Sequence, residues 1–240
     1  MSRTRHLANV LLDSPRWVET REMLMQEDAE IFGLSGNRRS FVAASPHEQA
    51  LIAVVGRPDA AFIQAAAQAR AHPGTEVLCA EENFEYVAQA LGDWHGYRAQ
   101  AFAWPGDVPL PQAQRDVSII ERSAYDRLDV PAALRLEFHD GSPGGPLVAA
   151  LDGGRPVAFC YPSAVTETLW DVSVDTLEGY RRRGHAGRAF RHLAHLLGAR
   201  NRWPVWLALD RNLASLGLAR KLGFEPAERL ALFIREPLAE

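Results

Sequence analysis

Residues 172–193, VSVDTLEGYRRRGHAGRAFRHL, place three arginines and two glycines between a predicted strand and a predicted helix. A turn that only reverses the chain needs no such charge. Small residues such as Gly184 and Gly187 let the chain approach a ligand closely, so that consecutive amide N–H groups can point at one anion. The first turn of a helix also favours negative charge. The stretch therefore predicts a cradle for a diphosphate. It is neither a Walker loop nor a dinucleotide fingerprint, since G-x-x-x-x-G-K-[ST] and G-x-G-x-x-G are both absent.

The positive charge is local. The formal net charge is -4, yet residues 179–209 contain seven arginines and no Asp or Glu. Such a field suits one compact anion. Nucleic acid is the competing anion, but few aromatic residues near the arginines, chiefly Trp203 and Trp206, are available for base stacking, and residues 1–112 are acidic, with 9 basic and 14 acidic side chains. We therefore expect no nucleic-acid partner.

Length and composition narrow the class of protein. The 240 residues suffice for two domains, and 47% hydrophobic with 23% charged residues is typical of a globular protein. Nowhere does the sequence contain the roughly 20 consecutive apolar residues of a membrane span, and the apolar run after Met1 is too short for a secretory signal. Two cysteines without CxxC spacing argue against a disulfide scaffold or structural zinc. A cytoplasmic protein without membrane association is expected.

The proline-rich segment 105–115, PGDVPLPQAQR, predicts a linker, and hence domains at residues 1–112 and 113–240. The second half begins with a short strand at 118–121 and a helix over 124–140 that is broken near Pro131. Strands at 146–152 and 156–165 flank the turn Asp152-Gly153-Gly154-Arg155, which is a strong hairpin signal. A third strand covers 169–176.

After the arginines, Phe190, Leu193, Ala194 and Leu197 follow the spacing of one apolar helix face, opposite Arg188, Arg191 and His195. A buried strand at 204–210, a helix at 212–223 ending at Gly223, and a strand at 229–234 complete this half. Residues 50–104 have a similar order: strand 50–56, turn and helix 57–72, strand 75–80, helix 82–92 and strand 97–104. They could be a degenerate repeat, or two ordinary α/β segments that look alike. The turn GRPDAAF of the first half lacks the glycines and arginines of a cradle.

These residues resemble the GNAT superfamily of acyl-CoA-dependent N-acyltransferases. Its signature, Gln/Arg-x-x-Gly-x-Gly/Ala, is matched by Arg181, Gly184 and Ala186. A second signature, an Asn after a strand followed by a helix ending Lys-Leu-Gly-Phe, is matched by Asn212, Ser215 and residues 221–225. The resemblance covers residues 113–240. It implies an α/β (α+β) GNAT fold with a mixed, mostly antiparallel sheet flanked by helices, preceded by a smaller α/β domain.

The resemblance also implies a cofactor site for acetyl-CoA and no metal. The strand edge at Val174, Asp175 and Thr176 would contact the pantetheine arm, and the amides from Arg182 to Gly187 would hold the pyrophosphate. Asn212 and Ser215 would contact the pantetheine or the far end of the cofactor. The implied cofactor residues are Val174, Asp175, Thr176, Arg181, Arg182, Arg183, Gly184, His185, Ala186, Gly187, Arg188, Asn212 and Ser215. The tyrosine that protonates the departing thiolate in many members is replaced here by Ala219.

Transfer to an amine also needs a proton acceptor. Asp171, Ser173 and Asp175 alternate with valines and share one strand face. By family analogy Asp171 is the first candidate base and Glu167 the second; a solvated strand face or a hairpin ion pair is the alternative interpretation. Cys160 is interpreted as a core residue. His192 and His195 lack a third metal ligand and are interpreted as exposed polar residues.

The sequence thus predicts an N-acetyltransferase that moves an acetyl group from acetyl-CoA to an amine by direct attack in a ternary complex. The alternative, motivated by Ala219, is a noncatalytic acyl-CoA-binding or regulatory module. A basic nucleic-acid-binding module ranks third. The acceptor, expected to be a small-molecule or peptide amine, and the oligomeric state are left open by the sequence.

Overall fold

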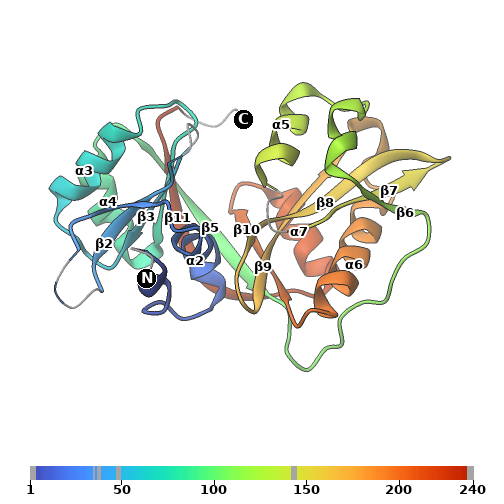
Figure 1. Cartoon of the computed structure of the whole chain (residues 1–240), viewed down its shortest axis with the longest axis horizontal. Coiled ribbons are helices and arrows are strands. Elements are labelled where there is room, and N and C mark those ends of the chain that lie inside the picture. Colours follow the sequence, from blue (N-terminus) through green and yellow to red (C-terminus); the bar gives the residue numbers. More distant parts are fainter. Residues whose placement is uncertain (1–3, 35, 37–38, 47–49, 142–144, 237–240) are drawn as a thin grey trace. The chain divides into compact units, whose positions relative to one another are not determined.

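A computed structural model of the chain describes residues 4–34, 36, 39–46, 50–141 and 145–236 (Figure 1). These residues form two compact units. The first comprises the described residues of 1–101, 208–216 and 226–240, and the second comprises those of 102–207 and 217–225. The domain boundary expected after residue 112 stays a prediction. The contacts group two C-terminal segments with the N-terminal one.

In the first unit, strands β1 (Glu30–Phe32), β2 (Phe41–Ala44), β3 (Leu51–Val55) and β4 (Glu76–Ala80) lie side by side, with β11 (Glu225–Ile234) next to β4. β4 runs parallel to β3, whereas β11 pairs antiparallel with β4 from Leu230–Ala80 to Ile234–Glu76. The last strand of the chain therefore completes the sheet of the first unit. β5 (His95–Ala103) follows in the strand order after β11.

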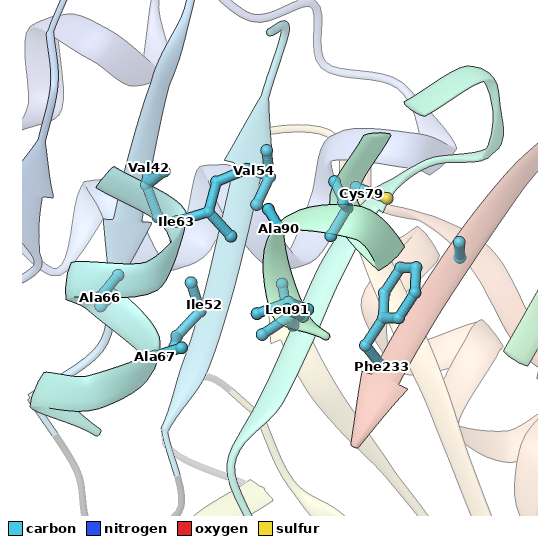
Figure 2. Close-up of a cluster of buried hydrophobic side chains, with 14 residues drawn as sticks. Val42, Ile52, Val54, Ile63, Ala66, Ala67, Cys79, Ala90, Leu91 and Phe233 are labelled. Atoms are coloured by element: carbon cyan, nitrogen blue, oxygen red, sulfur yellow. The ribbon is translucent and has the colours of Figure 1, made fainter. Parts of the chain in front are cut away.

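Helices cover both faces of this sheet. Helices α3 (Ala60–Ala69) and α4 (Phe84–Leu91, after the 3₁₀ turn η2, Glu81–Asn83) bury Ile63, Ala66 and Leu91 against β2, β3 and β4. Phe233 of β11 belongs to the same cluster and is fully buried (Figure 2). On the other face, Leu7 of α1 (Arg5–Ala8) and Leu24 of α2 (Val18–Met25, after η1, Pro15–Trp17) form a second cluster. Burial of apolar area on both faces stabilises the unit.

The second unit has the strand order β10, β9, β8, β7 and β6. Their bounds are β6 Val117–Ile120, β7 Leu147–Asp152, β8 Arg155–Val165, β9 Leu169–Thr176 and β10 Trp203–Leu209. The predicted hairpin is confirmed, since Gly153 and Gly154 join β7 to β8 with φ of 56° and 84°. Two consecutive positive φ values are what a two-residue hairpin turn requires.

The helices of this unit also lie on opposite faces of its sheet. η3 (Arg122–Arg127) and α5 (Ala132–Gly141) are separated at Pro131, as predicted, and Phe138 of α5 packs on Phe159 and Tyr161 of β8. On the other face, α6 (His185–Gly198) buries the predicted stripe completely, and Phe190 stacks on Trp170 of β9. Consequently the even-numbered side chains of β9 face α6 and the odd-numbered ones face α5.

The fold class predicted from the sequence is confirmed. The strands are mostly antiparallel, and among the described register pairs only β3 with β4 and β9 with β10 are parallel. Each parallel pair is joined through a helix, α3 in the first unit and α6 in the second, so the two halves share a β-α-β order. α7 (Leu213–Leu222) ends at Gly223, where φ is 104°, as the predicted C-terminal cap requires.

Segment 105–115 contains no helix or strand, as expected of a linker, but it packs on α6. An ideal Cβ added to Gly198 would lie 2.4 Å from Cδ1 of Leu110, which shows how closely the segment approaches the helix. The backbone of Gln114 also lies 3.2 Å from Nδ1 of His192. His192 is therefore a half-buried contact of this segment rather than an exposed polar residue, whereas His195 is exposed as predicted.

Candidate functional site

The turn predicted to be a diphosphate cradle lies where β9 leads into α6. The 3₁₀ turn η4 (Glu178–Tyr180) and the arginines follow β9, and Gly184 precedes the helix in the left-handed region with φ of 84°. A Cβ at Gly184 would meet no atom within 4 Å, so the space beside it is open. Arg182 also has a positive φ, 61°. Non-glycine residues rarely adopt this region, and such strain clusters at functional sites.

The N-terminus of α6 is left without a cap. No side chain caps it, and the first amides of a helix have no acceptor inside the helix. The amides of His185, Ala186 and Gly187 lie in this first turn. Gly187 is close-packed, because a Cβ there would lie 3.2 Å from Nη1 of Arg191 and 3.5 Å from Cδ2 of Leu222. The cradle therefore combines open backbone donors with a tightly packed base.

Arg181, Arg182 and Arg183 are exposed around this turn. Nε of Arg181 donates to the carbonyl oxygen of Thr176 at 3.3 Å, which ties the cradle to the end of β9. The Arg183 guanidinium lies 3.9 Å from the Asp152 carboxylate and 5.5 Å from the centroid of the Tyr180 ring. Guanidinium groups beside the first amides of a helix are groups that can bind a phosphate.

His185 and Arg188 face into the unit. His185 is buried, and burial together with the charge of Arg188 lowers the pKa of its imidazole, so the ring is neutral at pH 7. Nη2 of Arg188 donates to the carbonyl oxygen of Leu151 at 3.0 Å, and Nη1 lies 3.7 Å from the Asp116 carboxylate. Arg188 therefore has internal contacts already, and its part in cofactor binding stays a prediction.

The edge of β9 next to the cradle is open beyond Asp171. Its described register pairs with β10 end at Asp171–Val205, whereas its pairs with β8 continue to Thr176–Ala158. The amide of Leu177 donates to Val157 on the β8 side. Because backbone groups alternate along a strand, those of Val174 and Thr176 point to the opposite, open edge. An extended ligand arm can add to such an edge as a strand does.

The two predicted bases occupy different positions. Asp171 lies on β9 and is 6% exposed, and its Oδ2 accepts a hydrogen bond from Oγ of Ser163 at 2.7 Å. Glu167 is exposed in the turn between β8 and β9. The geometry does not bring the two carboxylates together as neighbours on one strand face. Both assignments stay predictions.

Asn212 and Ser215 lie at the start of α7 and are assigned by contacts to the first unit. Oδ1 of Asn212 accepts a hydrogen bond from the amide of Ser215 at 3.0 Å, a side-chain cap that explains this pair locally. Their contact with a cofactor stays a prediction. Farther along α7, Ala219 is fully buried, so this position offers no hydroxyl to a leaving group.

Cys160 is fully buried on β8, which confirms its interpretation as a core residue. Burial raises the pKa of its thiol well above the ordinary value, and the charge of Asp175 adds to this, so a thiolate nucleophile is disfavoured. Within the described residues, no group of three His, Cys, Asp or Glu side chains could hold a metal ion. In the same part of the chain, no helix has the length and apolar character needed to cross a membrane.

The sequence interpretation missed one polar cluster on the α5 side of the sheet. Oη of Tyr161 donates to Oε2 of Glu137 at 3.2 Å, and Ser173 and Asp175 of β9 lie beside Tyr161. Asp175 was considered only for its backbone. Its alternation with Asp171 and Ser173 placed it on this face, but no local pattern indicated that Glu137 of α5 would meet it.

An open strand edge thus leads into an uncapped, glycine-containing helix N-terminus. Residues 137–233 match the family model described as GNAT acetyltransferase. This match confirms the resemblance to the GNAT superfamily for that part of the chain. A search of curated proteins found no match.

Solved structures extend the likeness in fold to almost the whole chain. A GCN5-related N-acetyltransferase-like protein from Streptococcus suis is 20% identical with a TM-score of 0.70, covering 96% of this chain and 97% of its own. A GCN5-related N-acetyltransferase from Kribbella flavida is 15% identical with a TM-score of 0.63, covering 100% and 97%. At these identities the comparison shows the fold, which therefore includes the N-terminal unit that the predicted resemblance left uncovered.

Proposed function

We propose that this protein transfers an acetyl group from acetyl-CoA to the amine of a small molecule or peptide, by direct attack in a ternary complex. The cradle between β9 and α6 is the observation that carries the proposal. Its amides and Arg181–Arg183 would hold the diphosphate, and the open edge of β9 would hold the pantetheine arm. The Val174 amide, which points to that edge, would polarise the thioester carbonyl.

The proposal is tested first by calorimetric titration of the full chain with acetyl-CoA and with coenzyme A. One-site binding in the micromolar range is expected, because the cradle is already formed. In Gly184→Leu, the side chain enters the open space that the diphosphate needs, and we expect affinity to fall at least about tenfold. Gly92→Leu is the matched control, since Gly92 also has a positive φ, 68°, and open surroundings.

The control separates backbone strain from loss of the site. Both substitutions place a leucine at a positive φ, so both should lower the thermal midpoint. Only Gly184→Leu should weaken binding. Equal affinity in the wild type and Gly184→Leu would remove the cradle assignment, and absence of binding in the wild type would remove the proposed function.

A noncatalytic acyl-CoA-binding module is the second candidate, because Ala219 stands where many GNAT enzymes have a tyrosine. The two candidates differ in turnover. Incubation with acetyl-CoA and a panel of amines, with free thiol as the readout, should show acceptor-dependent release if the protein is an enzyme. The thiolate is a modest base, so water can protonate it when the tyrosine is absent.

A further inference from the structure

Tyr161 is the centre of the polar cluster under α5. It is 4% exposed, and its hydroxyl donates to Glu137. Burial, followed by the charges of Asp175 and Glu137, raises the pKa of this phenol far above its usual range, so it keeps its proton. A buried hydroxyl that stays protonated is a fixed hydrogen-bond donor. It holds the Glu137 carboxylate on the face of β8 and β9 where Asp175 also lies.

Asp175 is the carboxylate of this cluster on the strand that leads to the cradle. Burial, and after it the charge of Glu137, raises its pKa to about 6, while the nearby Tyr161 hydroxyl and the charge of Arg181 oppose the rise. The titratable and charged groups around Asp175 come from three elements. They are Glu137 of α5, Tyr161 and Cys160 of β8, and Arg181 of the cradle. The carboxylate is therefore ionised at pH 7 to 8 but binds a proton more readily than an ordinary aspartate. A carboxylate with a pKa near 6 can accept a proton as a general base near neutral pH.

The position of Asp175 along β9 supports the same role. It lies between Val174 and Thr176, whose backbone groups point to the open edge proposed for the thioester arm. Its register partner is Phe159 of β8, whose side chain lies on the same α5-covered face. Asp171 is the more deeply buried carboxylate and already accepts a hydrogen bond from Ser163.

We propose that the Asp175 carboxylate accepts the proton of the attacking amine, and that Glu137 and Tyr161 are the positioning residues that hold it. The inference rests on the proposed function. An acceptor that arrives as an ammonium ion gives one proton to Asp175, and the neutral amine attacks the thioester carbonyl carbon. A C–N bond forms and the C–S bond breaks. The nitrogen's second proton goes to the thiolate, directly or through water, and Asp175 returns its proton to water.

The test measures thiol release from acetyl-CoA with ethanolamine, spermidine, glycine amide and a short peptide with a free N-terminus, between pH 5.5 and 9. Asp175→Asn is expected to lower kcat for the best acceptor about 100-fold at pH 7, the effect of losing a general base, while its Kd for acetyl-CoA stays within about twofold. The loss should shrink toward pH 9, where more of the amine is already neutral. Asp107→Asn, on an exposed loop of the same unit, should match the wild type.

Glu137→Gln tests the positioning role without removing the base. Loss of the neighbouring negative charge should lower the pKa of Asp175, so the acid limb of kcat/KM should move to lower pH. The proposal is overturned if the acid limb of kcat/KM does not move in Glu137→Gln, or if Asp175→Asn keeps full activity. It is also overturned if only Asp171→Asn loses activity. A wild type that binds acetyl-CoA but acetylates none of the amines also overturns it and leaves the donor site standing. A wild type that does not bind acetyl-CoA overturns the proposed function itself.

Discussion

Single residues decide the chemistry that this site can perform. Gly184 permits a left-handed turn with open space beside it, and the buried Ala219 offers no hydroxyl to a leaving group. Asp175 has an elevated pKa because it is partly buried near Glu137. Such a carboxylate is held at a cost in stability, as is common at functional sites.

The cost at Asp175 predicts a pH-dependent effect on stability. Its pKa is about 6 in the folded protein, against an ordinary value of 3.8 for an aspartate, so the folded state binds more protons between these values. Its contribution to stability is therefore favourable below pH 4 and is lost as the pH rises through 6. Asp175→Asn should be more stable than the wild type at pH 8, by on the order of 1 to 2 kcal/mol after screening.

Urea unfolding of both proteins at pH 4, 6 and 8 checks this expectation. The difference in the free energy of unfolding should become small toward pH 4, because Asp175 is then protonated in the folded protein and partly protonated in the unfolded chain. A variant that is less stable than the wild type at pH 8 would contradict the sign. Asp175→Asn should also lose activity. Higher stability together with lower activity in this variant would show that Asp175 serves the reaction at a cost in stability.

At the scale of elements, the two β-α-β segments, β3-α3-β4 and β9-α6-β10, differ at the start of the helix. α6 begins without a side-chain cap, whereas the Asp59 carboxylate accepts a hydrogen bond from the amide of Ala61 at the start of α3, at 2.9 Å. The turn before α3 is also filled, because Arg57 donates to Asn83, and Asn83 donates to the carbonyl oxygen of Gly56. A negative cap and a filled turn leave no cradle for a diphosphate, in keeping with the sequence GRPDAAF.

Removal of that cap should therefore affect stability and not binding. Asp59→Ala is expected to lower the free energy of unfolding by about 1 kcal/mol, the usual value of an N-cap. Coenzyme A affinity, measured by calorimetry, should be unchanged. Asp93→Ala, at an exposed position of the same unit, should change neither quantity. Coenzyme A binding that weakens in Asp59→Ala would show that the first unit takes part in cofactor binding.

On the scale of the whole molecule, the chain order and the strand order differ. β11 is the last strand of the chain, yet it pairs with β4, and Ala231 and Phe233 are fully buried in the first unit's core. Phe102 and Trp104 come before the linker but belong to the second unit, where Trp104 packs on Phe190 and Phe224. Each unit is thus built from residues on both sides of segment 105–115.

Fragments cut at the linker should therefore fail to fold alone. Residues 1–112 lack the partner strand of β4, and residues 113–240 lack Trp104. We expect neither fragment to show a cooperative urea transition, whereas the full chain should show one. A chain with a protease site inserted in segment 105–115 and cleaved after folding is the control, and it should keep its native near-UV circular dichroism. Cooperative unfolding of either fragment would support independent domains with the boundary at residue 112.

Local features of the protein were determined by its sequence alone. The hairpin at Asp152–Arg155, the apolar stripe of α6 and the turn at Gly184 depend on neighbouring residues only, through backbone sterics and a repeat of 3.6 residues. Motif spacing then sufficed for the fold class and the cradle. Residues 4–46 contain two α-helices and two strands that no strong periodicity indicated.

Only the tertiary structure decided which distant segments meet. The pairing of β11 with β4, the open edge of β9 beyond Asp171 and the meeting of Glu137 with Tyr161 and Asp175 all join residues far apart along the chain or on different elements. Such contacts depend on the summed burial of whole elements and not on local propensity. For this reason the sequence placed the loop proposed to bind the cofactor, whereas the carboxylate proposed as the base emerged only from the packing of α5 on the sheet.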